Sequence, residues 1–148
     1  MDGCMPDDIV VNKAAVIERC VARVREEYGE DPRNLYEDVR RQDSIILNLL
    51  RASEASIDLA MHLIRRHRLG IPQESRDAFE MLSSAGLLGR QLADRMMAMV
   101  GFRNVAVHEY QRLNVNIVKG IFENDLGDFL SFSTWALKTQ TATEPRNP

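Results

Sequence analysis

Residues 96–110 read Met96-Met97-Ala98-Met99-Val100-Gly101-Phe102-Arg103-Asn104-Val105-Ala106-Val107-His108-Glu109-Tyr110. The first half of this stretch is apolar on every side, and a helix that is apolar all round is normally buried. The second half introduces an Arg, an Asn, a His and a Tyr. An arginine is almost never fully buried without a partner, because an unpaired buried charge is costly. The stretch therefore predicts a packed helix that ends in a functional cluster of polar side chains.

The composition of the whole chain is that of one ordinary globular domain. It has 148 residues, of which 45% are hydrophobic and 28% are charged. A chain of this length buries a hydrophobic core without the help of disulfides or a structural metal. We expect one helical domain over residues 1–140 and a polar, disordered tail over residues 141–148. The net charge of −3 gives no overall signature of nucleic-acid binding, so any contact with RNA has to depend on local charge.

The amino-terminal segment and the cysteines indicate a cytoplasmic protein. Cys4 and Cys20 have neither CxxC nor zinc-type spacing, which fits a reducing compartment. The first eight residues lack the basic start and apolar run of a signal peptide. The longest apolar run, residues 96–102, is far too short to span a membrane, so no membrane association is expected.

Apolar residues recur at three- and four-residue spacing along nearly the whole chain, which predicts helices and no strands. Asp7 or Asp8 is placed to cap the first helix and Gly29 to end it, and Pro32 suits the first turn of the second. The predicted helices cover residues 8–28, 32–67, 73–85, 90 to 107 or 108, and 114–139. Short connections between long helices favour an antiparallel bundle. The expected fold class is therefore all-α, with about five helices.

The polar cluster suits metal-independent cleavage of RNA. His108 is able to move a proton to or from the ribose 2′-hydroxyl or the leaving oxygen, and Arg103 is able to neutralise charge on the phosphate. Asn104, four residues before His108 on the same helix face, is placed to orient the His or the phosphate. No Asp/Glu/His cluster has metal-ligand spacing, so neither a metal nor a cofactor is expected.

The spacing of Arg103 and His108 raises a geometric question. Five residues correspond to about 140° of rotation on an ideal helix, so the two side chains meet only if the helix ends or bends between them. Tyr110 lies two residues past the His, where the pattern breaks into a loop. Because one His supplies one acid–base group, a symmetric dimer with two facing sites would be a natural solution.

The residues Arg103, Asn104, His108 and Tyr110 resemble the R-x4-H-x-Y motif of the HepT-type HEPN toxins. Neighbouring sequence segments are similar too, and the resemblance extends from about Asp43 to about Asp128. The segments that carry it are Asp43-Ser44-Ile45-Ile46-Leu47-Asn48, Leu69-Gly70-Ile71-Pro72, Ser75-Arg76-Asp77-Ala78-Phe79 and Met99-Val100-Gly101-Phe102.

The resemblance implies an all-α HEPN fold and a homodimer with an RNase cleft between its protomers. It also implies a partner, a minimal nucleotidyltransferase antitoxin that transfers AMP to Tyr110 and forms a larger assembly with the toxin. The catalytic residues carried over are Arg103, Asn104 and His108, and the substrate is RNA, such as tRNA or mRNA. This chain has no nucleotidyltransferase motif of its own, so the partner would be a separate polypeptide.

Simpler interpretations of the same residues stay open. Arg103 and Asn104 are also consistent with a buried structural pair, with the Arg held by Glu54, Asp58 or a terminal carboxylate. His108 is also consistent with a helix cap, and Tyr110 with a residue that closes the loop. The protein would then be a non-catalytic dimer that presents itself to a nucleotidyltransferase, or a purely structural helical dimer.

Two further groups have both an ordinary and a functional interpretation. Asp58 and His62, four residues apart, are more typical of a surface pair than of a metal site. The run Arg65-Arg66-His67-Arg68 suits either a solvated helix end or an RNA-binding patch.

Overall fold

The computed structural model describes residues 7–109 and 113–142 of the chain, with the backbone alone for residues 140–142. Over these residues the fold is all-α, as expected, and no strand occurs in them. None of their helices is long and apolar enough to cross a membrane. Tyr110 and residues 143–148 of the expected tail lie outside the described residues.

Helix α1, Asp8–Tyr28, begins and ends where the sequence predicts. The Asp7 carboxylate accepts a hydrogen bond from the backbone N–H of Ile9 at 3.0 Å, which satisfies a donor that the helix start leaves unpaired. At the other end Gly29 has a φ of 62°, a left-handed conformation that glycine adopts without a Cβ clash. Its N–H donates to the carbonyl of Arg25 at 2.9 Å.

The prediction of one continuous helix over residues 32–67 is wrong, because this segment forms two helices. A short α2, Arg33–Tyr36, precedes the long α3, Val39–Arg66. The break falls at Asp38, whose backbone is extended and whose carboxylate accepts hydrogen bonds from the N–H groups of Arg40 and Arg41 at 3.1 and 3.2 Å. An aspartate that caps a new helix cannot continue the old one, since its own backbone has left the helical region.

The remaining helices agree with the predicted spans to within about two or three residues. Helix α4 covers Ser75–Ser84 and helix α5 covers Arg90–His108. The predicted fifth helix is a continuous helical run made of α6, Val115–Gly120, a π-helical segment η2, Ile121–Asp125, and α7, Leu126–Ala142. The last of these continues two residues past the domain boundary that we expected at residue 140.

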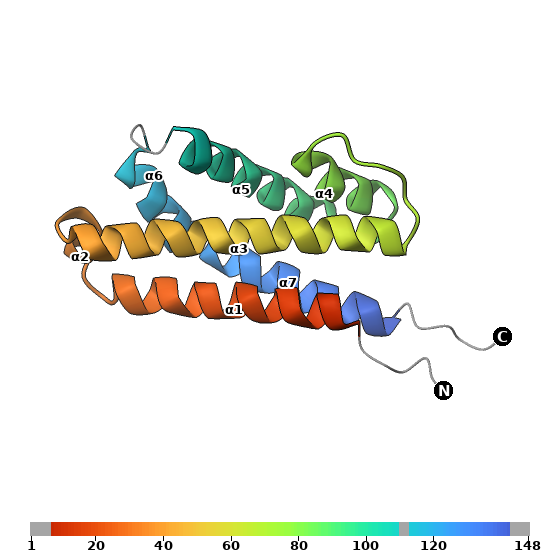
Figure 1. Cartoon of the computed structure of the whole chain (residues 1–148), viewed down its shortest axis with the longest axis horizontal. Helices are drawn as coiled ribbons and strands as arrows, with labels where there is room; N and C mark the ends of the chain where they lie inside the picture. The colour runs from red at the N-terminus through yellow and green to blue at the C-terminus, as the bar shows by residue number, and fades with distance from the viewer. Residues whose placement is uncertain (1–6, 110–112, 143–148) are drawn as a thin grey trace.

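The helices pack as a bundle with α3 at its centre (Figure 1). Helices α1 and α3 lie side by side, α7 crosses behind them, and α4 and α5 pack against the opposite side of α3. Their common core includes the fully buried rings of Phe79, Phe129 and Phe132. This packing fixes α5, the helix of the polar motif, against α3 and α4.

Candidate functional site

Helix α5 directs Arg103 and His108 from different sides of the helix. It runs without a break from Arg90 to His108, so the helix neither ends nor bends between Arg103 and His108. The condition under which these two side chains would meet in one chain is therefore not fulfilled, and they leave the helix about 140° apart. Asn104 and His108 share a face, and both are exposed.

Arg103 points into the junction of three helices. Its Nη2 donates to the Ser75 hydroxyl of α4 at 3.1 Å, and its Nη1 donates to the Oδ1 of the adjacent Asn104 at 3.0 Å. Its Nε lies 3.5 Å from the Glu54 carboxylate of α3. Of the two carboxylates on α3 that the structural interpretation offered, Glu54 contacts Arg103, whereas Asp58 pairs with Lys13 at 3.0 Å. The terminal carboxylate lies outside the described residues.

The guanidinium of Arg103 is only weakly neutralised by these contacts. Both Nη donors have neutral acceptors, and the Glu54 contact is too long and poorly directed for a hydrogen bond from the buried Nε. The Arg103 side chain is 19% exposed and that of Glu54 is 47% exposed, so solvent screens their attraction. The structure thus fixes the orientation of Arg103 and leaves its charge available to an anion.

A polar pocket lies beside this arginine. It has a volume of about 250 Å³ and is formed where the start of α4 meets α5. The lining residues are Glu74, Ser75, Arg76, Val100 and Asn104. Because Ser75 and Asn104 also hold Arg103, an anion in the pocket would be within reach of its guanidinium.

His108 is the last residue of α5 and is exposed to solvent. The helix closes on the N–H of Glu109, which donates to the carbonyl of Val105 at 2.8 Å. An exposed side chain at this position can reach both the last carbonyls of the helix and a bound substrate. The capping interpretation and the catalytic interpretation of His108 are therefore compatible.

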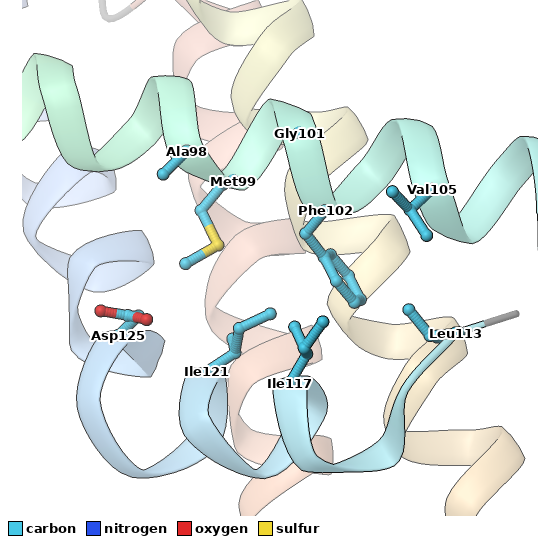
Figure 2. Close-up of a pocket in the computed structure, with 9 residues that line it drawn as sticks. All are labelled: Ala98, Met99, Gly101, Phe102, Val105, Leu113, Ile117, Ile121 and Asp125. Atoms are coloured by element: carbon cyan, nitrogen blue, oxygen red, sulfur yellow. The ribbon is translucent and has the colours of Figure 1, made fainter.

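The face of α5 that carries His108 also borders an apolar pocket of about 270 Å³ (Figure 2). Gly101, Val105 and His108 recur at spacings of four and three, so they lie along one side of the helix. Figure 2 shows Phe102 and Val105 of α5 facing Ile117 and Ile121 across the pocket. Val105 and Ile117 are 40% and 53% exposed, so this surface is apolar and uncovered in the single chain.

Asp58 and His62 do not form the surface pair that we expected. The Nε2 of His62 lies 2.6 Å from the Asp7 carboxylate, and Arg66 Nη1 donates to the same oxygen at 2.7 Å. Sequence reasoning assigned Asp7 only a capping role, because its partners come from the far end of α3. Burial alone would raise the pKa of Asp7, but the hydrogen bond and charge of His62 and two backbone N–H groups bring this pKa below its ordinary value.

No group of three or more His, Cys, Asp or Glu side chains that could hold a metal occurs among the described residues. The expectation of a metal-independent site remains a prediction, which the cleavage assay with a chelator tests.

Comparisons with known proteins agree with this fold. A family model described as Ribonuclease HepT-like matches residues 17–134. The mRNA nuclease HepT of Shewanella oneidensis is 47% identical over 126 residues, which are 85% of this chain and 94% of that protein.

Solved structures show the same similarity in three dimensions. A tri-AMPylated Shewanella oneidensis HEPN toxin in complex with its MNT antitoxin has a TM-score of 0.82 and 45% identity, covering 87% of this chain and 96% of that one. A toxin–antitoxin structure with AMP-PNP has a TM-score of 0.83 and 44% identity, covering 87% and 97%.

The all-α bundle with an Arg-Asn-x3-His sequence on α5, together with these similarities, defines the class of this protein as a helical HEPN ribonuclease. The chain belongs to the HepT-like ribonuclease family. The fold class and the enzyme class expected from the sequence are confirmed.

Proposed function

We propose that this protein is the endoribonuclease toxin of a toxin–antitoxin pair and acts on RNA in the cytoplasm. The observation that carries the proposal is the Arg103 guanidinium, which three helices hold in a fixed orientation beside a polar pocket while its charge stays weakly neutralised. The similarity to an mRNA nuclease and to a HEPN toxin bound by an MNT antitoxin supports the same activity and the same kind of partner.

In this mechanism Arg103 contacts the scissile phosphate through paired N–H donors and stabilises the charge that develops on it. Asn104 accepts from Arg103 and, from the same helix face as His108, orients the phosphate or the imidazole. His108 transfers the proton between the ribose 2′-hydroxyl and the leaving oxygen. The 2′-oxygen attacks phosphorus, the P–O5′ bond breaks, and the products are a 2′,3′-cyclic phosphate and a 5′-hydroxyl.

A homodimer would complete the site. Within one chain the helix directs Arg103 and His108 to different sides, and one imidazole provides one acid–base group. The uncovered apolar surface of Val105 and Ile117 is continuous with His108, so a second copy seated there would bring two motifs together. Val105→Asp should then yield a folded monomer with little cleavage activity, as measured by light scattering and RNA assay. A dimer that survives this change would place the interface elsewhere.

The catalytic proposal is tested with purified chain on a pool of cellular RNA. His108→Gln should abolish cleavage and growth inhibition while the far-UV helix signal and the oligomeric mass remain unchanged. The control is His67→Gln, which removes an imidazole from the end of α3 and should leave cleavage intact at pH 7.5. Cleavage by folded His108→Gln would remove His108 from the mechanism, whereas a parent chain that cuts no RNA would favour the non-catalytic dimer that serves as the partner of a nucleotidyltransferase.

The regulation that we propose is AMP transfer to Tyr110 by the antitoxin. Tyr110 stands two residues after His108, and an added AMP would introduce bulk and a phosphodiester charge near the motif. Incubation with the partner nucleotidyltransferase, ATP and magnesium should add whole AMP units to Tyr110 and silence cleavage. Tyr110→Phe should gain no mass, because Phe lacks the acceptor hydroxyl. AMP found on another residue by mass spectrometry would contradict this assignment.

A further inference from the structure

A second charged depression lies away from the motif, on the surface between α1 and α3. Its volume is about 560 Å³, and we refer to it as the α1–α3 groove. The two helices that form it lie side by side along most of their length (Figure 1). Arg19 and Arg23 line it from α1, and Arg51 lines it from α3.

The arginines of the groove carry more positive charge than their surroundings neutralise. Among the described residues, no carboxylate lies within ion-pair distance of Arg19 or Arg51. Arg23 is 3.4 Å from Glu26, but both side chains are more than half exposed, and such pairs neutralise little. Asp43 also lines the groove, so its lining has one acidic side chain and three arginines. A local positive excess is notable in a chain whose net charge is −3.

The polar and apolar lining of the groove also fits a nucleic-acid strand. Asn48 is 9% exposed, and its Nδ2 donates to the carbonyl of Ser44 at 2.8 Å, so its amide is held in place. Leu47 is 44% exposed and offers an apolar surface beside the arginines. Cys20 lines the groove together with Arg19 and Arg51. Burial raises the pKa of its thiol, and the charges of Arg51 and Arg19 act in the opposite direction.

Helix α3 connects this groove to the motif. Arg51 lines the groove, and Glu54, one helical turn later, contacts Arg103. Residues three apart are neighbours on a helix surface, so a strand whose scissile phosphate sits at Arg103 reaches the groove by crossing α3.

We propose that the α1–α3 groove binds phosphodiesters of the RNA strand outside the cleaved bond. The proposal rests on the ribonuclease function argued above and adds a second RNA contact to it. Guanidinium groups suit phosphate because their planar N–H donors match two phosphate oxygens. Bound this way, the groove contributes affinity for long RNA and leaves the bond-breaking step unchanged.

The test compares two double variants of equal charge. Arg19→Gln with Arg51→Gln removes two groove arginines, and Arg25→Gln with Arg40→Gln removes two exposed arginines that do not line the groove. The groove variant should raise KM for long single-stranded RNA at least about tenfold with kcat unchanged. Its slope of log affinity against log salt should fall by about 1.4, since each phosphate contact on a single strand contributes about 0.7. The control should change neither quantity by more than about twofold.

Affinity is also measured in the His108→Gln background, where RNA is bound without being cut. A parent protein that does not cleave RNA overturns the ribonuclease mechanism. The RNA affinities measured in the His108→Gln background then test the groove by themselves. Equal losses in the groove and control variants would show general attraction and overturn the groove. Unchanged RNA affinity with an altered oligomeric mass or weaker antitoxin capture would overturn it as well, because the groove would then be a protein interface.

Discussion

The Nε of Arg103 lies 3.5 Å from the Glu54 carboxylate, although the two residues are 49 positions apart in the sequence and on different helices. This contact, together with the Ser75 hydroxyl, joins α5 to both α3 and α4. It gives Arg103 a structural role and a fixed orientation at once. The two roles are separable by experiment, because stability and cleavage respond differently to its replacement.

Replacing Arg103 should remove cleavage at little cost in stability. Arg103→Ala should lower the free energy of unfolding by about 1 kcal/mol or less, because its ion pair is long and solvent-screened. Arg103→Lys keeps the charge but loses the paired donors, and we expect kcat/KM to fall by about 10²- to 10³-fold. Urea unfolding and single-substrate kinetics measure the two effects. A large loss of stability with cleavage retained would show that Arg103 only fixes packing.

The ends of the RNA products should report the attacking group. Attack by the 2′-oxygen leaves a 2′,3′-cyclic phosphate, and a substrate with 2′-deoxyribose at the cut position should resist cleavage. Excess chelator should leave the rate unchanged, since no metal-ligand cluster occurs in the described part of the chain. Mass spectrometry of the products identifies the ends. A 3′-hydroxyl with a 5′-phosphate would mean that an activated water attacks. Loss of activity on chelation would count against a metal-independent site.

Asp7, whose side chain is only 7% exposed, should contribute more to stability than an exposed carboxylate. The Asp7 carboxylate accepts hydrogen bonds from a backbone N–H in the first turn of α1 and from Arg66, and it also contacts His62. Asp7→Ala therefore removes a helix cap and two contacts between helices. We expect a loss of about 2–3 kcal/mol in the free energy of unfolding. The adjacent Asp8→Ala removes an exposed carboxylate and should cost about 0.5 kcal/mol or less. Equal urea midpoints for the two variants would contradict the contacts described.

His67 should make the fold less stable in mild acid. Burial lowers the pKa of His67, and the charge of Arg66 lowers it further, while its Nε2 is buried without a hydrogen-bond partner in the described structure. The unfolded chain, with a pKa of about 6.5, therefore binds more protons than the native chain as the pH falls below that value. Stability contributed by the neutral imidazole is present above about pH 6.5 and is lost below it. Urea midpoints at pH 7.5 and 5.5 should differ less for His67→Gln than for the parent.

Replacing Arg68 by glycine should make the protein more stable. Its φ of 54° lies in the left-handed region, and the N–H of Leu69 donates to the carbonyl of Ile64 at 3.0 Å to close α3. A side chain there costs about 1–2 kcal/mol, part of which the greater flexibility of glycine in the unfolded chain offsets. Arg68→Gly should stabilise the protein by about 0.5–1 kcal/mol. Arg65→Gly, three residues earlier in the helix, should destabilise it by about 1 kcal/mol.

Local sequence rules predicted most helix positions because those rules depend on neighbours in the chain. The cap at Asp7, the left-handed turn at Gly29 and the span of α5 needed only periodicity and terminal residue types. The break at Asp38 was missed because an aspartate within an apolar periodicity fits a continuous helix and a new cap equally well. The π-helical turn at Ile121–Asp125 was not predicted either, because the apolar periodicity there fits an ordinary α-helix.

The sequence by itself determined the helical class, the motif and, through the resemblance, the family. Tertiary structure decided what the motif residues contact. Glu54 and Ser75 hold Arg103, and Asp7 meets His62, because helices distant in the chain pack together. Such pairings depend on the geometry of the whole bundle, which periodicity along one helix does not encode. The unbroken run of α5 separates Arg103 from His108 within one chain, and the packing of α5 against α6 leaves an apolar surface beside the His.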